Sequence, residues 1–244
     1  MQKGIKFRIY PNREQKNFIH QTLGCCRLIY NRGLAMRKES YEEGKKIGYT
    51  QTSAMLTELK RQEEFAFLKA ADSIALQQSL RDLDRSFVNF FQKRASYPTF
   101  KSKHNRFQSY RTVNQKDNIR IVGRYIKLPK LGFVKIRQSM EVGKINHVTI
   151  EYTPAGKYFA VLNVDFEPEP RPNAGGTIGI DVGIKAFYSD SNGNTVSNPR
   201  YLERAMRKLI REQRRLSRKQ KDSHNRGKQR LRVARVHEKI ANQR

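Results

Sequence analysis

The sequence contains no apolar run long enough to cross a bilayer, and its first residues lack the apolar core that a secretory signal needs. We therefore expect a cytoplasmic protein. Cysteine is also scarce, because the chain has only Cys25 and Cys26, which are adjacent. Adjacent thiols form neither an ordinary disulfide nor a zinc knuckle, so both are expected to be buried or half-buried packing residues.

Acidic residues are few: 22 Asp and Glu stand against 50 Lys and Arg, which gives a formal net charge of +28. A charge of this size does not indicate a fold, but it favours a polyanionic partner, and nucleic acid is the first candidate. A basic protein of the ribosomal type is the alternative, and it would also bind nucleic acid. A membrane surface is disfavoured because the basic residues are spread along the chain without a lipidation motif.

Several common catalytic motifs are missing as well. The five histidines are scattered without ligand spacing, and the chain has neither a Gly-rich phosphate loop with its Lys nor a convincing Ser-His-Asp set. The hydrophobic fraction of 37% in 244 residues is still sufficient for one large domain, or two small ones, with a real core.

Residues 1–95 are predicted to form a strand followed by helices. The strand, residues 3–10, ends at Pro11, and Asn12 with Gln15 suits a capping box. Apolar residues then recur at intervals of three and four over residues 12–44, where Gly24 and Gly33 are expected to weaken or break the helix. Two further helical patterns cover residues 52–62 and 72–96, the second with Asp72 or Ser73 as its cap.

The pattern changes to period two after residue 105, and six short strands are predicted before residue 168. Their number and their basic outward positions favour a small barrel or a strongly bent sheet. Residues 167–176 have the composition of a linker. Three more strands follow, the last two joined by a hairpin at Asn192-Gly193. Residues 199–244 are predicted to be helical, and their 17 Lys and Arg against four acids indicate a phosphate-facing surface.

One carboxylate, Asp181, falls within the apolar, strand-like stretch "TIGIDVGIKAF" and is expected to be buried there. A strand with a carboxylate and then an antiparallel hairpin is how a ribonuclease-H-like nuclease core begins. Such cores use two divalent metal ions to hydrolyse phosphodiesters, and Mg²⁺ prefers oxygen ligands. The alternative is that Asp181 lies at a strand end or pairs with a Lys, and the pattern alone does not decide between the two.

Five segments, taken in order, resemble the TnpB (OrfB) family of transposon-encoded RNA-guided DNA endonucleases, which are related to the type V CRISPR effectors. The segments are "FRIYPNREQKNFIHQTLGCCRLIYN", "YPTFKSK", "IKLPKLGFVKIR", "GIDVGIKAF" and "LSRKQKDSHNRGKQRLRVARVHEKIANQR". The resemblance implies an α+β fold with a helical recognition lobe, residues 11–95, inserted in a small basic β-barrel. This barrel, the wedge, comprises residues 1–10 and 96–170. Residues 171–244 then form the N-terminal part of a RuvC-like, ribonuclease-H-like α/β domain with basic helices.

The resemblance makes Asp181 the first catalytic carboxylate and a Mg²⁺ ligand. It also implies two partners, a guide RNA from the transposon end and a double-stranded DNA target, in a bacterial cytoplasm. The family continues with a strand that carries a Glu, a four-cysteine zinc finger and a third motif with an Asp, none of which is present here. The acids after Asp181 lie in a hairpin turn or among the basic helices, so none is expected to face it.

Basic side chains are the candidates for nucleic-acid binding, since Lys and Arg neutralise phosphates and interleaved aromatics can stack on bases. The residues are Lys101, Lys103, Arg106 and Arg111, and in the C-terminal helices Arg214, Arg215, Arg218, Lys219, Arg226, Lys228 and Arg230. Four aromatic residues accompany the first group: Tyr97, Phe100, Phe107 and Tyr110. Packing of these aromatics in the barrel core is an equal alternative.

Three functions follow from these observations. The first is an RNA-guided DNA endonuclease of which this chain is a truncated form that binds RNA and DNA but does not cut alone. The second is a nuclease-dead, RNA-guided repressor that occupies DNA, and the third is a non-functional transposon remnant whose unfinished sheet leaves an open edge. The sequence assigns no oligomeric state.

Overall fold

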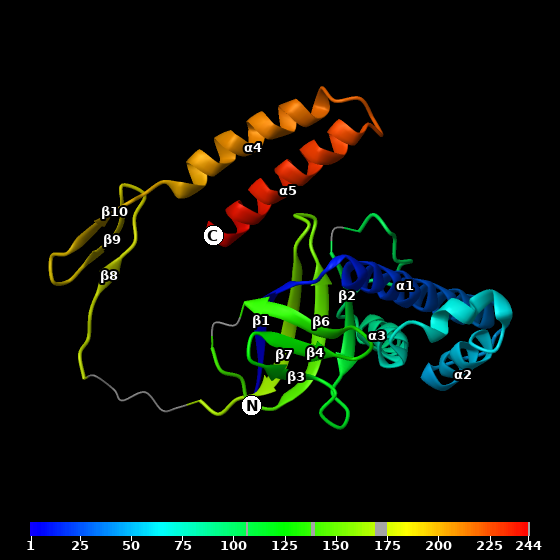
Figure 1. Ribbon diagram of the computed structural model, residues 1–244. Coiled ribbons are helices and arrows are strands. Elements are labelled where there is room, and N and C mark those ends of the chain that lie inside the picture. Colours follow the sequence, from blue (N-terminus) through cyan, green and yellow to red (C-terminus); the bar gives the residue numbers. More distant parts are fainter. Residues whose placement is uncertain (106, 138–139, 169–174, 244) are drawn as a thin grey trace. The chain divides into compact units, whose positions relative to one another are not determined.

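The computed structural model describes residues 1–105, 107–137, 140–168 and 175–243 (Figure 1). These residues form a mixture of helices and antiparallel sheet that divides into two compact units. The first unit comprises Met1–Thr153 and Lys157–Glu167, and the second comprises Pro154–Gly156 and Pro168–Arg244. In the described part of the chain, no helix has the length and apolarity that a membrane span requires.

A seven-stranded antiparallel sheet, ordered β2-β6-β7-β1-β5-β4-β3, forms the centre of the first unit (Figure 1). Its strands are β1 (Gln2–Tyr10), β2 (Gln108–Val113), β3 (Arg120–Val122), β4 (Tyr125–Leu128), β5 (Gly132–Arg137), β6 (Ile145–Tyr152) and β7 (Tyr158–Asp165). The six strands predicted after residue 105 are therefore confirmed.

The sheet is curled, as its many short strands predicted. Strand β1 lies between β7 and β5. It pairs with β7 from Gln2 to Ile9 and with β5 from Arg8 to Tyr10. At the end of β2, the Asn114 side-chain amide donates to the carbonyl oxygens of Ile119 and Ile145, at 3.1 and 2.9 Å. The Asn114 side-chain oxygen in turn accepts from the Ile119 backbone N–H at 3.0 Å. One amide side chain thus fixes the turn that leads from β2 into β3.

Helix α1 (Arg13–Glu42) is continuous, so the expected break at Gly24 or Gly33 does not occur. It begins at the predicted capping box, in which Asn12 and Gln15 exchange side-chain to backbone hydrogen bonds at 2.8 and 3.0 Å. Each glycine costs an exposed helix about 1 kcal/mol relative to alanine. Burial of the apolar face of α1 against the sheet and α3 offsets that cost, because packing outweighs propensity.

Helix α3 (Ser73–Phe91) follows α2 (Tyr49–Leu59) and a 3₁₀ helix (Glu63–Lys69). Asp72 is its N-cap, as predicted, and accepts hydrogen bonds from the backbone N–H groups of Ile74 and Ala75. Leu76, Leu80 and Leu83 are fully buried on its inner face. Phe91, by contrast, is 74% exposed at the end of the helix.

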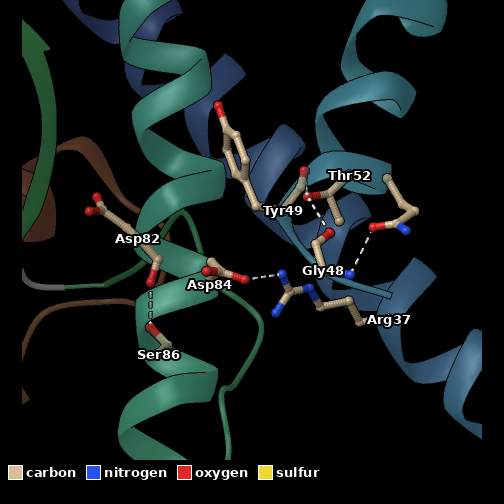
Figure 2. A network of polar contacts seen from close by, with 8 residues as sticks. Arg37, Gly48, Tyr49, Thr52, Asp82, Asp84 and Ser86 are labelled. Carbon is tan, nitrogen blue, oxygen red and sulfur yellow. Dashed lines mark hydrogen bonds and ion pairs between the residues drawn. The ribbon is translucent and has the colours of Figure 1, made fainter. Parts of the chain in front are cut away.

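An ion pair joins helices α1 and α3 in Figure 2. Arg37 of α1 is buried, lies 4.8 Å from the ring centroid of Phe87, and forms an ion pair with Asp84 of α3. The Asp82 carboxylate, two residues earlier, points away from Arg37 in the same view and pairs with Arg111 of β2. Because residues two apart lie on opposite sides of a helix, these two acids join α3 to α1 on one side and to the sheet on the other.

The second unit contains a three-stranded antiparallel sheet, ordered β10-β9-β8, and two helices. The strands are β8 (Ile180–Asp181), β9 (Ala186–Asp190) and β10 (Thr195–Ser197), and the helices are α4 (Tyr201–Ser217) and α5 (His224–Gln243). The helices pack against each other through Ala205, Leu209, Val233, Val236 and Ile240. This spacing of three and four is typical of a helical hairpin with one apolar seam.

Candidate nucleic-acid interface and the Asp181 carboxylate

Asp181 is exposed, so the expectation that it is buried is wrong. It pairs with Ser189 of β9, at the edge of a sheet that has only three strands in the described part of the chain. The apolar residues near it are exposed too, with Val182 at 72% and Ile184 at 90%. The apolar pattern was interpreted as a buried strand, but burial depends on partner elements that a local pattern cannot supply.

Asp190, the nearest acid along the chain, does not complete a site with Asp181. The strand register places Asp181 opposite Ser189 and Asp190 opposite Ile180, so the two acids lie on opposite faces of the sheet. Asp190 instead accepts hydrogen bonds from the backbone N–H groups of Asn192 and Asn194 and from the Asn194 side chain, at 2.8–2.9 Å. These bonds hold the pKa of its carboxyl below the ordinary value.

The predicted hairpin between β9 and β10 is present, but its loop is longer than the two residues Asn192-Gly193. The loop between β9 and β10 includes Ser191 to Gly193, and of these three residues only Gly193 has a positive φ, of 83°. A two-residue turn at Asn192-Gly193 would need positive φ at both positions. Since the Asp190 carboxylate binds the N–H groups of the loop, it favours a longer loop with glycine in the left-handed position.

The residues near Asp181 do not fit a two-metal centre. Among the residues described, no group of three or more His, Cys, Asp or Glu side chains is placed to hold a metal ion. Glu203 forms an ion pair with Arg207, and Glu212 lies in the helical seam, where it accepts a 2.7 Å hydrogen bond from Gln229. Glu212 also pairs with Arg215. Both acids thus pair within the basic helices.

The basic candidates of α4 and α5 separate into two groups. Arg215 forms a 3.0 Å ion pair with the buried Glu212. Arg226 donates hydrogen bonds to the carbonyl oxygens of Leu216 and Lys219, at 3.2 and 2.8 Å, where α4 ends. Arg226 is thus a cap for the carbonyl end of α4 rather than a free phosphate ligand. The other candidates are exposed and form no ion pair within the described part of the chain: Arg214, Arg218, Lys219, Lys228 and Arg230.

We expect this difference to appear in a matched pair of substitutions. Arg226→Gln should destabilise the helical hairpin by about 1 kcal/mol, because it removes charged hydrogen bonds to the last carbonyls of α4. Arg230→Gln should leave the hairpin unchanged and weaken nucleic-acid binding instead. Thermal unfolding followed by circular dichroism, with binding by fluorescence anisotropy, measures both effects. Equal loss of stability in the two variants would contradict the capping role.

In the first unit, the predicted residues Lys101 and Arg111 are committed to internal contacts. The Lys101 ammonium lies 4.1 Å from the ring centroid of Tyr30, and its backbone exchanges hydrogen bonds with the Asn31 side chain at 2.8 and 2.9 Å. Partial desolvation lowers the pKa of Lys101, although Asp82 acts in the opposite direction. Arg111 pairs with Asp82. Lys103 is exposed, and Arg106 lies outside the described residues.

Two neighbouring recesses lie beside these residues. The smaller, of about 130 Å³, is lined by Lys101, Phe107 and Arg111 among others, and the larger, of about 780 Å³, includes Lys103. Arg27 and Gln108 line both recesses. Arg27 is not among the basic residues predicted from the sequence, although it lies with polar residues on one side of α1.

The aromatic residues divide between the two alternatives. Tyr110 is in the core, and Tyr97 packs against Phe87 and Phe90, with ring centroids 5.6 and 5.2 Å apart. Phe107, by contrast, is 78% exposed at the smaller recess and can offer a ring to a base. The interleaved pattern therefore combines core residues with an open stacking surface.

Two family models match the chain: a "Helix-turn-helix domain" of OrfB over residues 1–46, and the OrfB "Probable transposase" over residues 147–244. The chain is 37% identical over 248 aligned residues to a "Putative RNA-guided DNA endonuclease" of Streptomyces pristinaespiralis. It is 35% identical over 246 residues to the "Putative RNA-guided DNA endonuclease InsQ" of Escherichia coli K12. The chain belongs to the OrfB (TnpB) family.

This OrfB-family chain is matched over 100% and 98% of its length, but it spans only 61% and 60% of those two relatives. A solved CRISPR-Cas12f ternary complex is a distant structural neighbour, with 14% identity and a TM-score of 0.36; the likeness covers 95% of this chain and 58% of that one. Residues matched by the helix-turn-helix description form a strand and one continuous helix here.

Proposed function

We propose that this OrfB-family chain binds a guide RNA and, through it, a double-stranded DNA target, and that it does not cut DNA alone. The observation that carries the proposal is the set of exposed basic side chains on α4 and α5, which have few acids to neutralise them. Such a surface suits a phosphate backbone. The two relatives are named as RNA-guided DNA endonucleases, and the proposed binding would be the recognition step of that activity.

Different parts of the chain would bind different parts of the nucleic acid. Exposed Lys and Arg of the helical hairpin neutralise phosphates, and the curled sheet with α1 and α3 presents a second basic surface near Lys103. In RNA-guided recognition, base pairing reads the DNA sequence while the protein holds the backbone and a short flanking motif. The division into recognition, wedge and RuvC-like parts is likewise part of this proposal.

Asp181 is proposed as the first carboxylate of a metal-dependent nuclease site that needs further acids. One exposed carboxylate cannot hold two Mg²⁺ ions, so no cleavage step is assigned to the residues described here. A nuclease-dead, RNA-guided repressor is the second candidate function, and it is favoured by the same isolation of Asp181.

The experiment is to express the chain with its native flanking DNA, sequence the RNA that copurifies, and then assay DNA binding and Mg²⁺-dependent nicking. We expect one defined RNA, retained DNA binding, and no nicking by either the parent or the Asp181→Ala variant. Nicking that Asp181→Ala abolishes would overturn the claim that the chain does not cut. Heterogeneous RNA, or insoluble protein, would instead support the remnant hypothesis, since the apolar face around Ile184 is open.

A further inference from the structure

Among the described residues, those that line the larger recess, of about 780 Å³, are polar or aromatic and include no acid. The described cationic residues of this lining are Arg27 of α1 and Lys103 of the segment that precedes β2. Within the described residues, neither side chain forms an ion pair. The Gln108 side chain donates a 2.6 Å hydrogen bond to the Lys103 carbonyl oxygen, so the segment that carries Lys103 is held in place. These features give the recess a positive rim whose Lys103 backbone is held in place.

An aromatic pair forms one side of the same recess. The rings of His20 and Tyr152 meet edge to face, with centroids 4.7 Å apart, and His20 Nε2 lies 2.8 Å from the Tyr158 hydroxyl oxygen. That hydrogen bond fixes the imidazole ring, and desolvation lowers the pKa of His20, which favours the neutral ring. A neutral, positioned ring beside cations is the arrangement on which nucleobases stack.

Helix α1 presents one polar stripe to the recess. Asn17, His20, Gln21 and Arg27 follow the helical spacing of three, four and seven residues, and Gly24 lies between them on the same stripe. Gly24 has no positive φ, and a Cβ placed there would meet only Arg27 Nη2, at 3.9 Å. Neither backbone conformation nor close packing therefore requires glycine at this position. What its missing side chain does provide is free space beside Arg27, on the stripe of α1 that lines the recess.

We propose that this recess is a subsite for one unpaired nucleotide of the bound strand, with the base against His20 and Tyr152 and a flanking phosphate against Arg27 and Lys103. The rise from His20 to Arg27 is about 10 Å at 1.5 Å per residue, a spacing that a base and a neighbouring phosphate can bridge. The Asn17 and Gln21 amides supply donors and acceptors for a base edge. The inference rests on the proposed function, because it names where a nucleic-acid strand is held.

The test compares Arg27→Gln/Lys103→Gln and Gly24→Leu with the parent chain. The control is Lys38→Gln/Lys46→Gln, which removes the same charge from positions outside the recess. The probes are short single-stranded RNA and DNA oligonucleotides that carry one 2-aminopurine, and matched duplexes. We expect the first pair to weaken single-strand binding about tenfold and to reduce the salt slope by roughly 0.7, the value for the one phosphate that is no longer neutralised. Gly24→Leu should reduce 2-aminopurine quenching without lowering the melting temperature, since a leucine there adds a side chain beside Arg27 on the stripe that lines the recess, and it favours helix.

The outcomes distinguish failure of the subsite proposal from failure of the proposed function. A loss of binding by the recess variants that is confined to RNA, or confined to DNA, supports the subsite and identifies the strand that it holds. Unchanged binding and quenching in the recess variants, or losses no larger than those of the control, overturn it. If the parent chain binds no nucleic acid at all, the proposed function fails with it. If the parent binds and the variants do not differ from it, only the subsite fails.

Discussion

The affinity of the chain for a nucleic-acid duplex should fall on the order of 10³-fold between 50 and 200 mM salt, if about six phosphates are neutralised. The physical reason is counterion release, because each Lys or Arg that binds a phosphate frees a condensed cation and makes binding depend on salt. The net charge of +28 and the exposed arginines and lysines of α4 and α5 supply these interactions. Anisotropy titrations with a labelled duplex at several salt concentrations measure the slope.

The control for this prediction is a variant in which Arg214, Arg218, Lys219, Lys228 and Arg230 are replaced by glutamine. If all of them bind phosphates, the slope of log K against log salt should become shallower by up to about 4.5, at about 0.9 for each phosphate. Arg226 is left unchanged in this variant because it caps α4. A flat salt response of the parent chain would rule out the electrostatic interpretation.

Leu80→Ala should destabilise the first unit by about 2–5 kcal/mol, because Leu80 is fully buried in the core that α1, α3 and the sheet share. For a unit of this size that corresponds to a fall of roughly 5–15 °C in the melting temperature. Leu80 also leaves little space at Gly33 of α1, where an added Cβ would lie 2.9 Å from Leu80 Cδ2 and 3.0 Å from Leu83 Cδ2. Gly33→Ala alone should therefore not stabilise the protein, because overpacking against these leucines offsets the gain in helix propensity.

In the double variant the two changes should compensate each other. The cavity left by Leu80→Ala receives the new methyl group, so Gly33→Ala should become stabilising in that background, with a coupling energy of about 0.5–3 kcal/mol. Gly24→Ala is the matched control, since a Cβ there meets nothing closer than 3.9 Å and should stabilise by up to about 1 kcal/mol in either background. Strict additivity of Leu80→Ala and Gly33→Ala, measured by thermal unfolding, would show that the two positions are not in contact.

Local patterns predicted much of the structure. The capping box at Asn12 and the Asp72 cap depend on residues within one turn of each other, and short stretches of alternation were enough to find the strands of the curled sheet. The family, too, followed from short ordered segments and was confirmed by the comparisons. The role of Asp181 as a catalytic carboxylate stays a prediction.

The charge, the order of helices and strands, and the shortage of acids near Asp181 could all be predicted from the sequence, since each is set by composition or short-range spacing. Which basic side chains are available depends on the tertiary contacts. Arg226 and Arg111 look like Arg230 in the sequence, but each has partners supplied by another element. The tertiary contacts also distinguish Gly33, which allows α1 and α3 to approach each other, from Gly24, where an added Cβ would meet only Arg27. The reason is that exposure and pairing depend on contacts between residues far apart in the chain, which a local pattern does not encode.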